Sequence, residues 1–182
     1  KPPALPEVYD LKGEKMKIGD IKKTAVIGAG TMGAQIAEVL SRMGSYEVGM
    51  VDINDDLVRK GFQLIDQRLE RFFVSKEKIT AEEKKMIMNR IKGYTSIEEA
   101  ARNADLVIEA VVEKMALKKE IFKKLDEGAP VPAILASNTS YLNISEMASA
   151  TKRAEKVVGI HFFNPVAVMQ LVEVVRGGRT SA

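Results

Sequence analysis

The stretch that decides the fold runs from Thr24 to Gly33 and reads TAVIGAGTMG. Its first four residues form an apolar run typical of a buried strand, and the GxGxxG motif that follows opens an amphipathic helix. In this context Gly28 permits a tight turn, Gly30 lets the backbone approach a pyrophosphate, and Gly33 lets the helix pack close to the strand. The helix N-terminus adds free N–H groups and the positive end of a dipole. The sequence therefore predicts a dinucleotide site with these cofactor-binding residues: Gly28, Ala29, Gly30, Thr31, Met32 and Gly33.

An acidic residue at the end of the second strand is the other element of such a site. Asp52 occupies that place, 19 residues beyond Gly33. A carboxylate there accepts hydrogen bonds from the ribose hydroxyls and repels a 2′-phosphate, so NAD is favoured over NADP. The alternative is an ordinary glycine turn followed by a solvated acid. Because strand, glycines, helix and acid occur in the expected order, we favour the NAD site.

Apolar runs bounded by glycine and separated by helical segments continue along the chain from Lys23. Such alternation is typical of βαβ units, in which helices cover a parallel sheet. The sequence thus predicts an α/β fold: a Rossmann-type doubly wound, mostly parallel sheet with an inserted helical hairpin. The expected strands are Thr24–Ile27, Glu47–Val51, Leu106–Ala110, Ala133–Ser137, Val157–His161 and Leu171–Val175.

The expected helices follow from apolar spacing and capping residues. The first is predicted to end at Gly44, acting as a C′ residue. A capping box at Thr80–Glu83 begins the second helix of the hairpin, with Ile87 and Ile91 on its apolar face, and Ser96–Glu99 is interpreted as another capping box. The long first helix of the hairpin has an apolar face predicted to contain Leu57, Gly61, Leu64, Ile65, Leu69 and Phe72. A later crossover helix is marked by Leu117, Ile121 and Leu125.

Composition excludes several classes of protein. The chain has 182 residues, of which 46% are hydrophobic and 29% charged, so one folded domain with a core is expected. With no cysteine, disulfides, thiolate metal sites and a cysteine nucleophile are excluded, and a single histidine argues against a metal site. The net charge of +3 and the lack of a long apolar run favour neither a nucleic-acid partner nor a membrane segment.

Three segments beyond the glycine motif carry a resemblance to a known family. They are Ala104–Glu113 (ADLVIEAVVE), Ala136–Ser140 (ASNTS) and Gly159–Val175, which contains GIHFFNP and LVEVV. Over the range from Lys23 to Gly178 the chain resembles the NAD-binding domain of L-3-hydroxyacyl-CoA dehydrogenases. The resemblance implies NAD as the cofactor, an acyl-CoA substrate, and the NAD-dependent oxidation of L-3-hydroxyacyl-CoA to 3-ketoacyl-CoA in fatty-acid β-oxidation.

His161 and Glu173 suggest the chemistry of the site. His161 follows an apolar strand at the edge where doubly wound sheets bind ligands, and a histidine can take and return a proton near neutral pH. Glu173 lies among β-branched residues, where a charge needs a partner. The plain alternatives are a structural histidine and a strand with one solvated face. By resemblance, His161 removes the proton of the substrate 3-hydroxyl and Glu173 orients and stabilises the imidazolium.

Four further site residues rest on the resemblance. Ser140 is expected to hydrogen-bond the substrate oxygen, Asn164 to lie by the nicotinamide end, and Glu113 and Lys118 to lie near the cofactor. Taken alone, Ser140 lies in a polar loop and Lys118 is one of several lysines on a helix. The family usually has a second serine where this chain has Tyr141, which concerns the packing of the loop more than its role.

The resemblance also bears on domain organisation and partners. Residues 1–22, with three prolines in the first six positions, are expected to be an arm or linker. Residues 23–182 are expected to be the NAD-binding domain, truncated before a C-terminal helical domain that covers the acyl chain and forms most of a homodimer interface. The isolated chain is therefore expected to turn over little substrate. The helical hairpin carries basic residues that would attract coenzyme A phosphates, namely Arg59, Lys60, Arg68, Arg71, Lys76 and Lys78.

Two alternatives stay open at this point. A dehydrogenase of simple β-hydroxy acids begins with the same kind of fold but typically uses a lysine base. A non-catalytic NAD-binding protein would retain the fold without the chemistry. We expect a cytoplasmic protein, with the mitochondrial matrix or the peroxisome as alternatives in a eukaryote.

Overall fold

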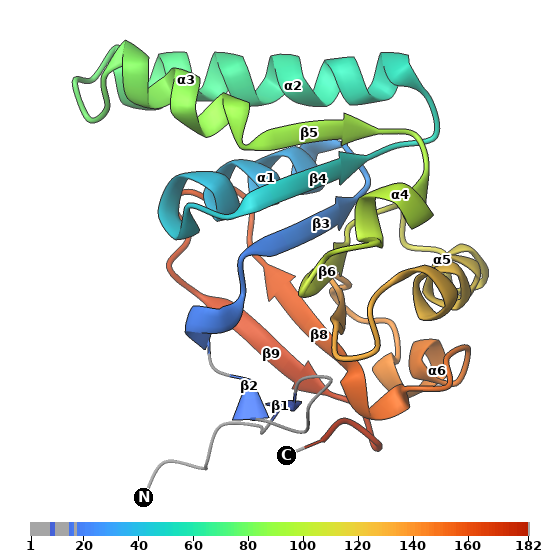
Figure 1. The fold of residues 1–182 in the computed structure, drawn as a ribbon. Coiled ribbons are helices and arrows are strands. Elements are labelled where there is room, and N and C mark those ends of the chain that lie inside the picture. The colour runs from blue at the N-terminus through green and yellow to red at the C-terminus, as the bar shows by residue number, and fades with distance from the viewer. Residues whose placement is uncertain (1–7, 10–14, 17, 182) are drawn as a thin grey trace, which may run out of the picture.

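A seven-stranded sheet organises the protein (Figure 1), and its strand order is β5-β4-β3-β6-β7-β8-β9. The structure is a computed structural model that describes residues 8–9, 15–16 and 18–181. The strands are β1 (Val8–Tyr9), β2 (Lys15–Met16), β3 (Lys23–Ile27), β4 (Glu47–Val51), β5 (Ile91–Tyr94), β6 (Leu106–Glu109), β7 (Ile134–Ser137), β8 (Val157–Phe162) and β9 (Val172–Arg176). The α-helices are α1 (Thr31–Gly44), α2 (Asp55–Leu69), α3 (Ala81–Asn89), α4 (Ile97–Ala101), α5 (Met115–Gly128) and α6 (Ile144–Ala148). Short turns of other helix types are η1 (Ile18–Asp20), η2 (Glu70–Val74) and η3 (Ala154–Lys156).

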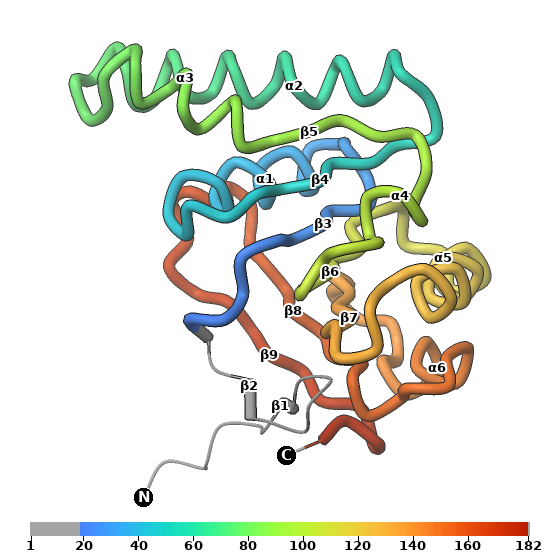
Figure 2. Tube along the Cα trace, in the orientation of Figure 1, coloured from blue at the N-terminus to red at the C-terminus, as the bar shows by residue number. Residues whose placement is uncertain are grey.

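The path of the chain through the sheet defines the fold. It starts at the central β3, moves outward through β4 to β5, and then crosses to β6, β7 and β8 on the other side, as the tube in Figure 2 lets the reader follow. All neighbouring strands in the row β5-β4-β3-β6-β7-β8 pair in parallel, and β9 pairs antiparallel with β8. This is the doubly wound Rossmann order, so the predicted fold class is confirmed. The order reverses between β3 and β6, and ligands of such sheets bind in the crevice outside the carboxyl ends at this point.

Two apolar cores lie on opposite faces of the sheet because successive strand residues point to opposite sides. In β3, Ala25 and Ile27 join the core beneath α4, α5 and α6, whereas Val26 joins the core beneath α1, α2 and α3. In β6, Val107 and Ile108 divide in the same way. The sheet therefore holds the glycine turn and the strand ends rigidly between two packed layers.

All six predicted strands are present within one residue at each end, but the sequence analysis missed β5. Ile91, predicted to lie on the apolar face of the second hairpin helix, is instead the first residue of β5, and α3 ends at Asn89. Ile91 is the one residue of this edge strand that is fully buried, so the sequence IKGY lacks the alternation by which a half-buried strand is recognised. The hairpin itself is confirmed, since α2 and α3 interrupt the alternation between β4 and β5.

Three details of the helices differ from expectation. The residue in the left-handed region after α1 is Ser45, with φ of 54°, and Gly44 is still helical. On α2 the buried face contains Val58, whereas Leu64 is 38% exposed on its flank. Phe72, predicted on the same apolar face, lies beyond the end of α2 in the turn η2 and is also 38% exposed. The capping box at the start of α3 is confirmed, with both of its reciprocal hydrogen bonds. At the start of α4, Ser96 accepts the Glu99 N–H but donates its hydroxyl to Glu98, so it caps the helix without completing a box.

The segment interpreted as an arm contains β1 and β2, which pair antiparallel as a separate two-stranded sheet. Most of residues 1–17 lie outside the described part of the chain. The division of the chain at residues 22 and 23 stays a prediction.

Candidate active site

The glycine turn between β3 and α1 has the geometry that a dinucleotide requires. Gly28 has φ of +105°, and a Cβ there would lie 2.8 Å from the Ala110 carbonyl oxygen. A Cβ on Gly33 would lie 1.7 Å from the Gly28 carbonyl oxygen, so only glycine lets α1 come this close to the strand. A Cβ on Gly30 would meet nothing within 4 Å, which leaves its backbone open to a ligand. These residues therefore fit the pyrophosphate of a dinucleotide.

The other predicted residues of the turn have different surroundings. Ala29 is 2% exposed and belongs to the apolar core, so it can offer a ligand its backbone but not its side chain. Thr31 is exposed at the first position of α1, and Met32 packs partly against the core. The free N–H groups at this helix N-terminus face the carboxyl edge of the sheet.

Asp52 ties the end of β4 to the glycine turn. One carboxylate oxygen accepts the Ala29 N–H at 2.8 Å, and the other accepts the Ile53 N–H at 2.8 Å. Each oxygen retains a lone pair for a further donor. A carboxylate held in this way is placed to accept hydrogen bonds from ribose hydroxyls.

A pocket of about 740 Å³ opens beside Asp52 at the carboxyl ends of β3, β4 and β6. Its walls are mainly apolar and come from the strand ends and from α4 and α5. The apolar residues that line it include Ile27, Val51, Ile53, Leu57, Ile97, Val111, Val112, Leu117 and Ile121. The volume lies within the range of small-molecule sites, and mainly apolar walls with the Asp52 carboxylate among their polar groups suit a base and its ribose.

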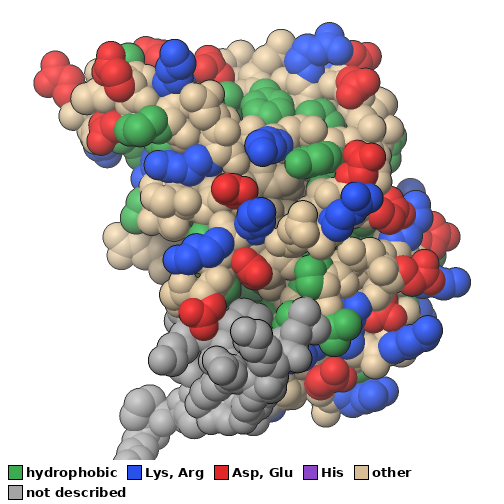
Figure 3. Space-filling model, viewed as in Figure 1, with side chains coloured by type: hydrophobic (Ala, Val, Ile, Leu, Met, Phe, Trp, Pro, Cys, Tyr) green, Lys and Arg blue, Asp and Glu red, His purple; other side chains and the backbone are tan. Residues whose placement is uncertain are grey.

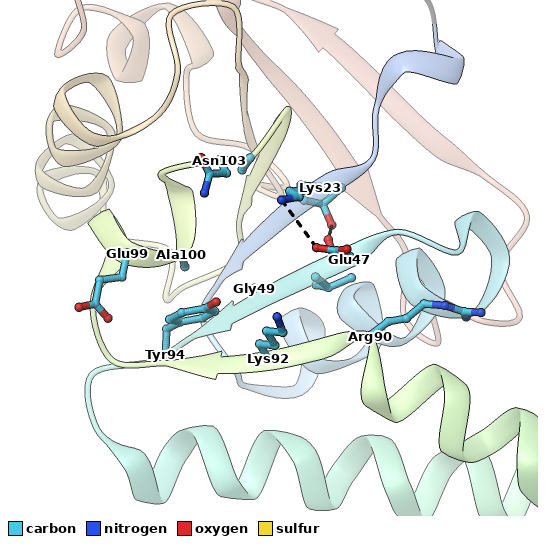
Figure 4. A pocket seen from close by; sticks show the side chains of 12 residues that line it. Lys23, Glu47, Gly49, Arg90, Lys92, Tyr94, Glu99, Ala100 and Asn103 are labelled. Atoms are coloured by element: carbon cyan, nitrogen blue, oxygen red, sulfur yellow. Dashed lines mark hydrogen bonds and ion pairs between the residues drawn. The ribbon is translucent and has the colours of Figure 1, made fainter.

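A second hollow, of about 170 Å³, lies elsewhere on the sheet (Figure 4). It extends along β4 and β5 from their amino ends, where the Lys23 ammonium lies 3.9 Å from the Glu47 carboxylate. Tyr94 and Lys92 line its outer side. This hollow contains none of the predicted site residues.

His161 stands at the centre of a hydrogen-bonded chain of side chains. Its Nδ1 lies 2.8 Å from Glu173 Oε2 and its Nε2 lies 3.1 Å from Ser140 Oγ. His161 and Glu173 are directly opposite each other in the β8–β9 ladder, whereas Ser140 comes from the loop after β7. An ionised carboxylate can only accept, so Glu173 fixes the proton of a neutral imidazole on Nδ1 and leaves a lone pair on Nε2. The structure thus brings together the three predicted catalytic residues, in a form suited to proton abstraction at Nε2.

Glu113 holds the loop that carries Ser140. Its Oε1 accepts the Ser140 N–H at 2.9 Å and the Thr139 hydroxyl at 2.8 Å. Burial alone would raise the pKa of the Glu113 carboxyl, but Lys118, the Ser140 N–H and the Thr139 hydroxyl together lower it. Glu113 is therefore held in its charged form, in which it accepts both bonds.

Lys118 is buried, which the sequence analysis did not anticipate. Its side chain is 1% exposed, and its ammonium lies 2.7 and 2.8 Å from the two carboxylate oxygens of Glu109 and 2.9 Å from Glu113 Oε2. Glu109 is fully buried at the end of β6 and also accepts bonds from the Val111 N–H and the Ser137 hydroxyl. The sequence signal that could have found Glu109 is a charged residue ending the apolar run LVIE, which requires a buried partner.

The segment after β8 is fastened by two residues that the sequence analysis did not single out. Asn138 Oδ1 accepts the Phe162 N–H at 2.8 Å, which anchors the end of β8 next to His161. Gln35 on α1 donates to Asn164 Oδ1 at 3.1 Å. Asn164 is exposed and lies at the edge shared by the glycine turn and His161.

The basic residues of the hairpin are partly engaged within the chain. Arg68 Nε lies 3.0 Å from the buried Glu38 carboxylate, and the guanidinium of Arg59 lies 2.9 Å from Asp56. The Phe72 ring has three cations near its face: Arg68, Arg71 and Lys76, at 5.7, 5.3 and 5.9 Å from its centroid. Over the described residues seen in Figure 3, basic and acidic side chains are interspersed.

Comparison with known proteins identifies the family. The sequence model of the family described as "3-hydroxyacyl-CoA dehydrogenase, NAD binding domain" matches residues 23–182. The chain therefore belongs to this family of NAD-binding domains, and NAD is its cofactor.

Individual relatives agree with this assignment. The chain is 47% identical over 162 residues to a probable 3-hydroxybutyryl-CoA dehydrogenase of Bacillus subtilis, covering 89% of this chain and 55% of that protein. It is 40% identical over 167 residues to the mitochondrial hydroxyacyl-coenzyme A dehydrogenase of Homo sapiens, covering 88% and 52%. The crystal structure of (S)-3-hydroxybutyryl-CoA dehydrogenase from Ralstonia eutropha matches with a TM-score of 0.84 at 43% identity, covering 88% and 56%. The chain thus spans about half the length of the curated relatives it matches.

A separate property concerns membranes. Within the described residues, no helix is both long enough and apolar enough to cross a bilayer.

Proposed function

We propose that this chain is the cofactor-binding and proton-transferring part of an enzyme that oxidises L-3-hydroxyacyl-CoA to 3-ketoacyl-CoA with NAD. The observation that carries the proposal is the hydrogen bond between His161 Nδ1 and Glu173, which leaves His161 Nε2 facing Ser140. These residues lie at the same edge of the sheet as the glycine turn. The names of the relatives, which act on 3-hydroxybutyryl-CoA or hydroxyacyl-CoA, support the substrate class.

The mechanism follows from the protonation of His161. With Nδ1–H donated to Glu173, the Nε2 lone pair accepts the proton of the substrate 3-hydroxyl. Ser140 Oγ, next to Nε2, hydrogen-bonds the same substrate oxygen and so marks where the oxygen sits. The positive charge that develops on the imidazole is stabilised by the Glu173 carboxylate. When bound, NAD supplies the acceptor for the hydride that leaves carbon 3.

The cofactor site is assigned residue by residue as part of the same proposal. The backbone of Gly28 to Gly33 binds the pyrophosphate, Asp52 binds the adenosine ribose, and Asn164 contacts the nicotinamide half. Glu113 keeps the Ser140 loop next to the cofactor, and Lys118 supports Glu113 from beneath. The β-hydroxy acid dehydrogenase alternative would require a lysine base, and the lysine nearest to Ser140 in this network, Lys118, is buried between two carboxylates.

We further propose the partners and the compartment of the whole protein. The substrate is an acyl-CoA, and the protein forms a homodimer through a C-terminal domain like that expected from the family. The net charge of +3 and the interspersed charges on the face seen in Figure 3 favour no nucleic-acid partner, and no membrane partner is proposed. The absence of cysteine is compatible with a reducing compartment, and we propose the cytoplasm. Residues 1–22 are proposed as an arm and residues 23–182 as the NAD-binding domain.

The experiment that tests the proposal combines binding and turnover on one sample. NADH binding is followed by its fluorescence, and NADH oxidation is followed by absorbance with acetoacetyl-CoA. Loss of the general base in His161→Gln should lower turnover by about 10²- to 10⁴-fold without weakening NADH binding. Binding without turnover in the wild-type chain would mean that the chemistry needs more of the protein than these residues. No binding of NADH would refute the proposal.

A further inference from the structure

Gln35 is a buried polar side chain inside the cofactor-binding helix. It lies one turn after the start of α1, is 2% exposed, and is surrounded by the apolar core residues of that helix. A buried amide is stable only when its donors and acceptor are satisfied. Its partners therefore show what the side chain holds in place.

Two backbone groups fix the orientation of the Gln35 amide. Its Oε1 lies 3.0 Å from the Val166 N, whose N–H can only donate. Its Nε2 lies 3.1 Å from the Thr31 carbonyl oxygen, which can only accept. Exchanging the two ends of the amide would oppose like groups at both places, so the network permits one orientation.

That orientation in turn fixes the amide of Asn164. The second N–H of Gln35 Nε2 points to Asn164, which meets it with Oδ1 at 3.1 Å. Asn164 must offer its oxygen here because the Gln35 group that faces it is the Nε2 amino group, which can only donate. The Nδ2 group of Asn164 is consequently turned away from Gln35, and it makes no hydrogen bond within the described part of the chain.

The free donor lies between the two functional parts of the site. Thr31 is the first residue of α1, directly after the glycine turn, whereas Asn164 follows His161 by three positions. Gln35 contacts both segments, although Asn164 lies 129 residues after Gln35 in the sequence. A group that spans the space from the glycine turn to His161 is the nicotinamide half of the cofactor.

We propose that Gln35 is a positioning residue that orients Asn164, so that Asn164 Nδ2 donates a hydrogen bond to an oxygen on the nicotinamide half of NAD. The acceptor is either the carboxamide oxygen or a hydroxyl oxygen of the adjoining ribose. This inference rests on the proposed placement of the nicotinamide beside His161. The hydrogen bond between the Gln35 and Asn164 amides therefore decides whether Asn164 offers its NH2 group or its oxygen to the cofactor.

The substitution Gln35→Glu tests the pairing because it keeps the shape and removes the donor. One oxygen of the introduced carboxyl group still accepts the Val166 N–H. The other faces both the Thr31 carbonyl oxygen and Asn164 Oδ1 and can donate at most one proton. Of these two acceptors only the Asn164 amide can turn over, so it presents its oxygen to the cofactor. The dissociation constant for NADH should rise about tenfold, as expected for one lost hydrogen bond. The matched control is Gln63→Glu, the same chemical change on the exposed face of α2, which should leave NADH binding unchanged.

Three ligands separate positioning from a general structural role. ADP lacks the ribose and the nicotinamide that Asn164 would contact, so Gln35→Glu should bind ADP as the wild type does. ADP-ribose then assigns the acceptor: weaker binding by the variant indicates a ribose oxygen, and unchanged binding indicates the carboxamide. Equal weakening of ADP and NADH would overturn the proposal, because it would mean that α1 itself is disturbed. Unchanged NADH binding would overturn it as well.

A second variant keeps the test valid if Gln35→Glu does not fold. Asn164→Asp changes an exposed residue, retains an oxygen for the Gln35 donor and presents a second oxygen to the cofactor. It should show the same loss for NADH with unchanged ADP binding, and wild-type affinity for NADH would overturn the proposal. Failure of the proposed function is distinguishable, since the wild-type chain would then bind neither NADH nor ADP.

Discussion

Replacing Lys118 by Met tests the buried charge network beneath the site. Methionine has nearly the length of the lysine stem but carries no charge. The change removes the ammonium that lies 2.7 and 2.8 Å from the Glu109 oxygens and 2.9 Å from Glu113. Glu109, at 0% exposure, is then left as a buried carboxylate without a counter-charge.

The magnitude follows from the bonds that remain. Breaking a buried ion pair by removing one partner destabilises a protein by about 3–5 kcal/mol. Glu109 would keep the Val111 N–H and the Ser137 hydroxyl, both at 2.7 Å, so we expect the lower end, about 3 kcal/mol. For a domain of this size, each kcal/mol lowers Tm by about 2–4 °C, which gives a decrease of about 6–12 °C.

Thermal unfolding followed by circular dichroism at neutral pH measures the effect. The double variant Lys118→Met with Glu109→Gln removes both charges and should recover at least half of the lost stability. Lys119→Met is the control on the same helix: Lys119 is 38% exposed and 3.5 Å from Glu146, so its loss should cost less than about 1 kcal/mol. The reasoning is refuted if Lys118→Met is no less stable than this control, or if the double variant is no more stable than the single one.

Other predictions concern the carboxylates and the glycines of the site. Because the pKa of Glu113 is lowered in the folded chain, its stabilising contribution is complete above its usual value of about 4.5 and is lost as the pH falls through the folded value. Urea titrations should therefore find Glu113→Gln less stable than wild type at neutral pH and equally stable in strong acid. In Asp52→Asn the charge that repels a 2′-phosphate is gone, so the ratio of NADPH to NADH affinity, measured by fluorescence titration, should rise about tenfold. Gly33→Ala should lower Tm sharply, since its Cβ would lie 1.7 Å from a carbonyl oxygen, whereas Gly30→Ala should leave Tm nearly unchanged and weaken NADH binding, because its Cβ occupies space that is open to the ligand.

The sequence was sufficient for the features that depend on local patterns. Buried parallel strands are apolar runs, so β3, β4, β6, β7 and β8 were found by this rule. The sixth predicted strand, β9, is antiparallel and exposed, and it was found from the apolar residues of LVEVV rather than from burial. The glycine motif placed the turn between β3 and α1 correctly. The edge strand β5 escaped because an edge strand buries little and its sequence carries no such run. The pairing of His161 with Glu173 was expected from the family pattern, and the register of β8 and β9 gives it a physical basis.

Only the tertiary structure decided how the polar groups satisfy one another. Lys118 looks like a surface lysine in sequence, but the packing of α5 against β6 buries it between Glu109 and Glu113. The two amides Gln35 and Asn164 likewise come together from α1 and from the segment after β8, and nothing in the local sequence of either residue signals the contact. The burial of an apolar side chain can be read from the local sequence, because such a side chain packs against any apolar neighbour. A buried hydrogen bond requires a particular partner at a particular distance, and that partner is known only once the chain has folded.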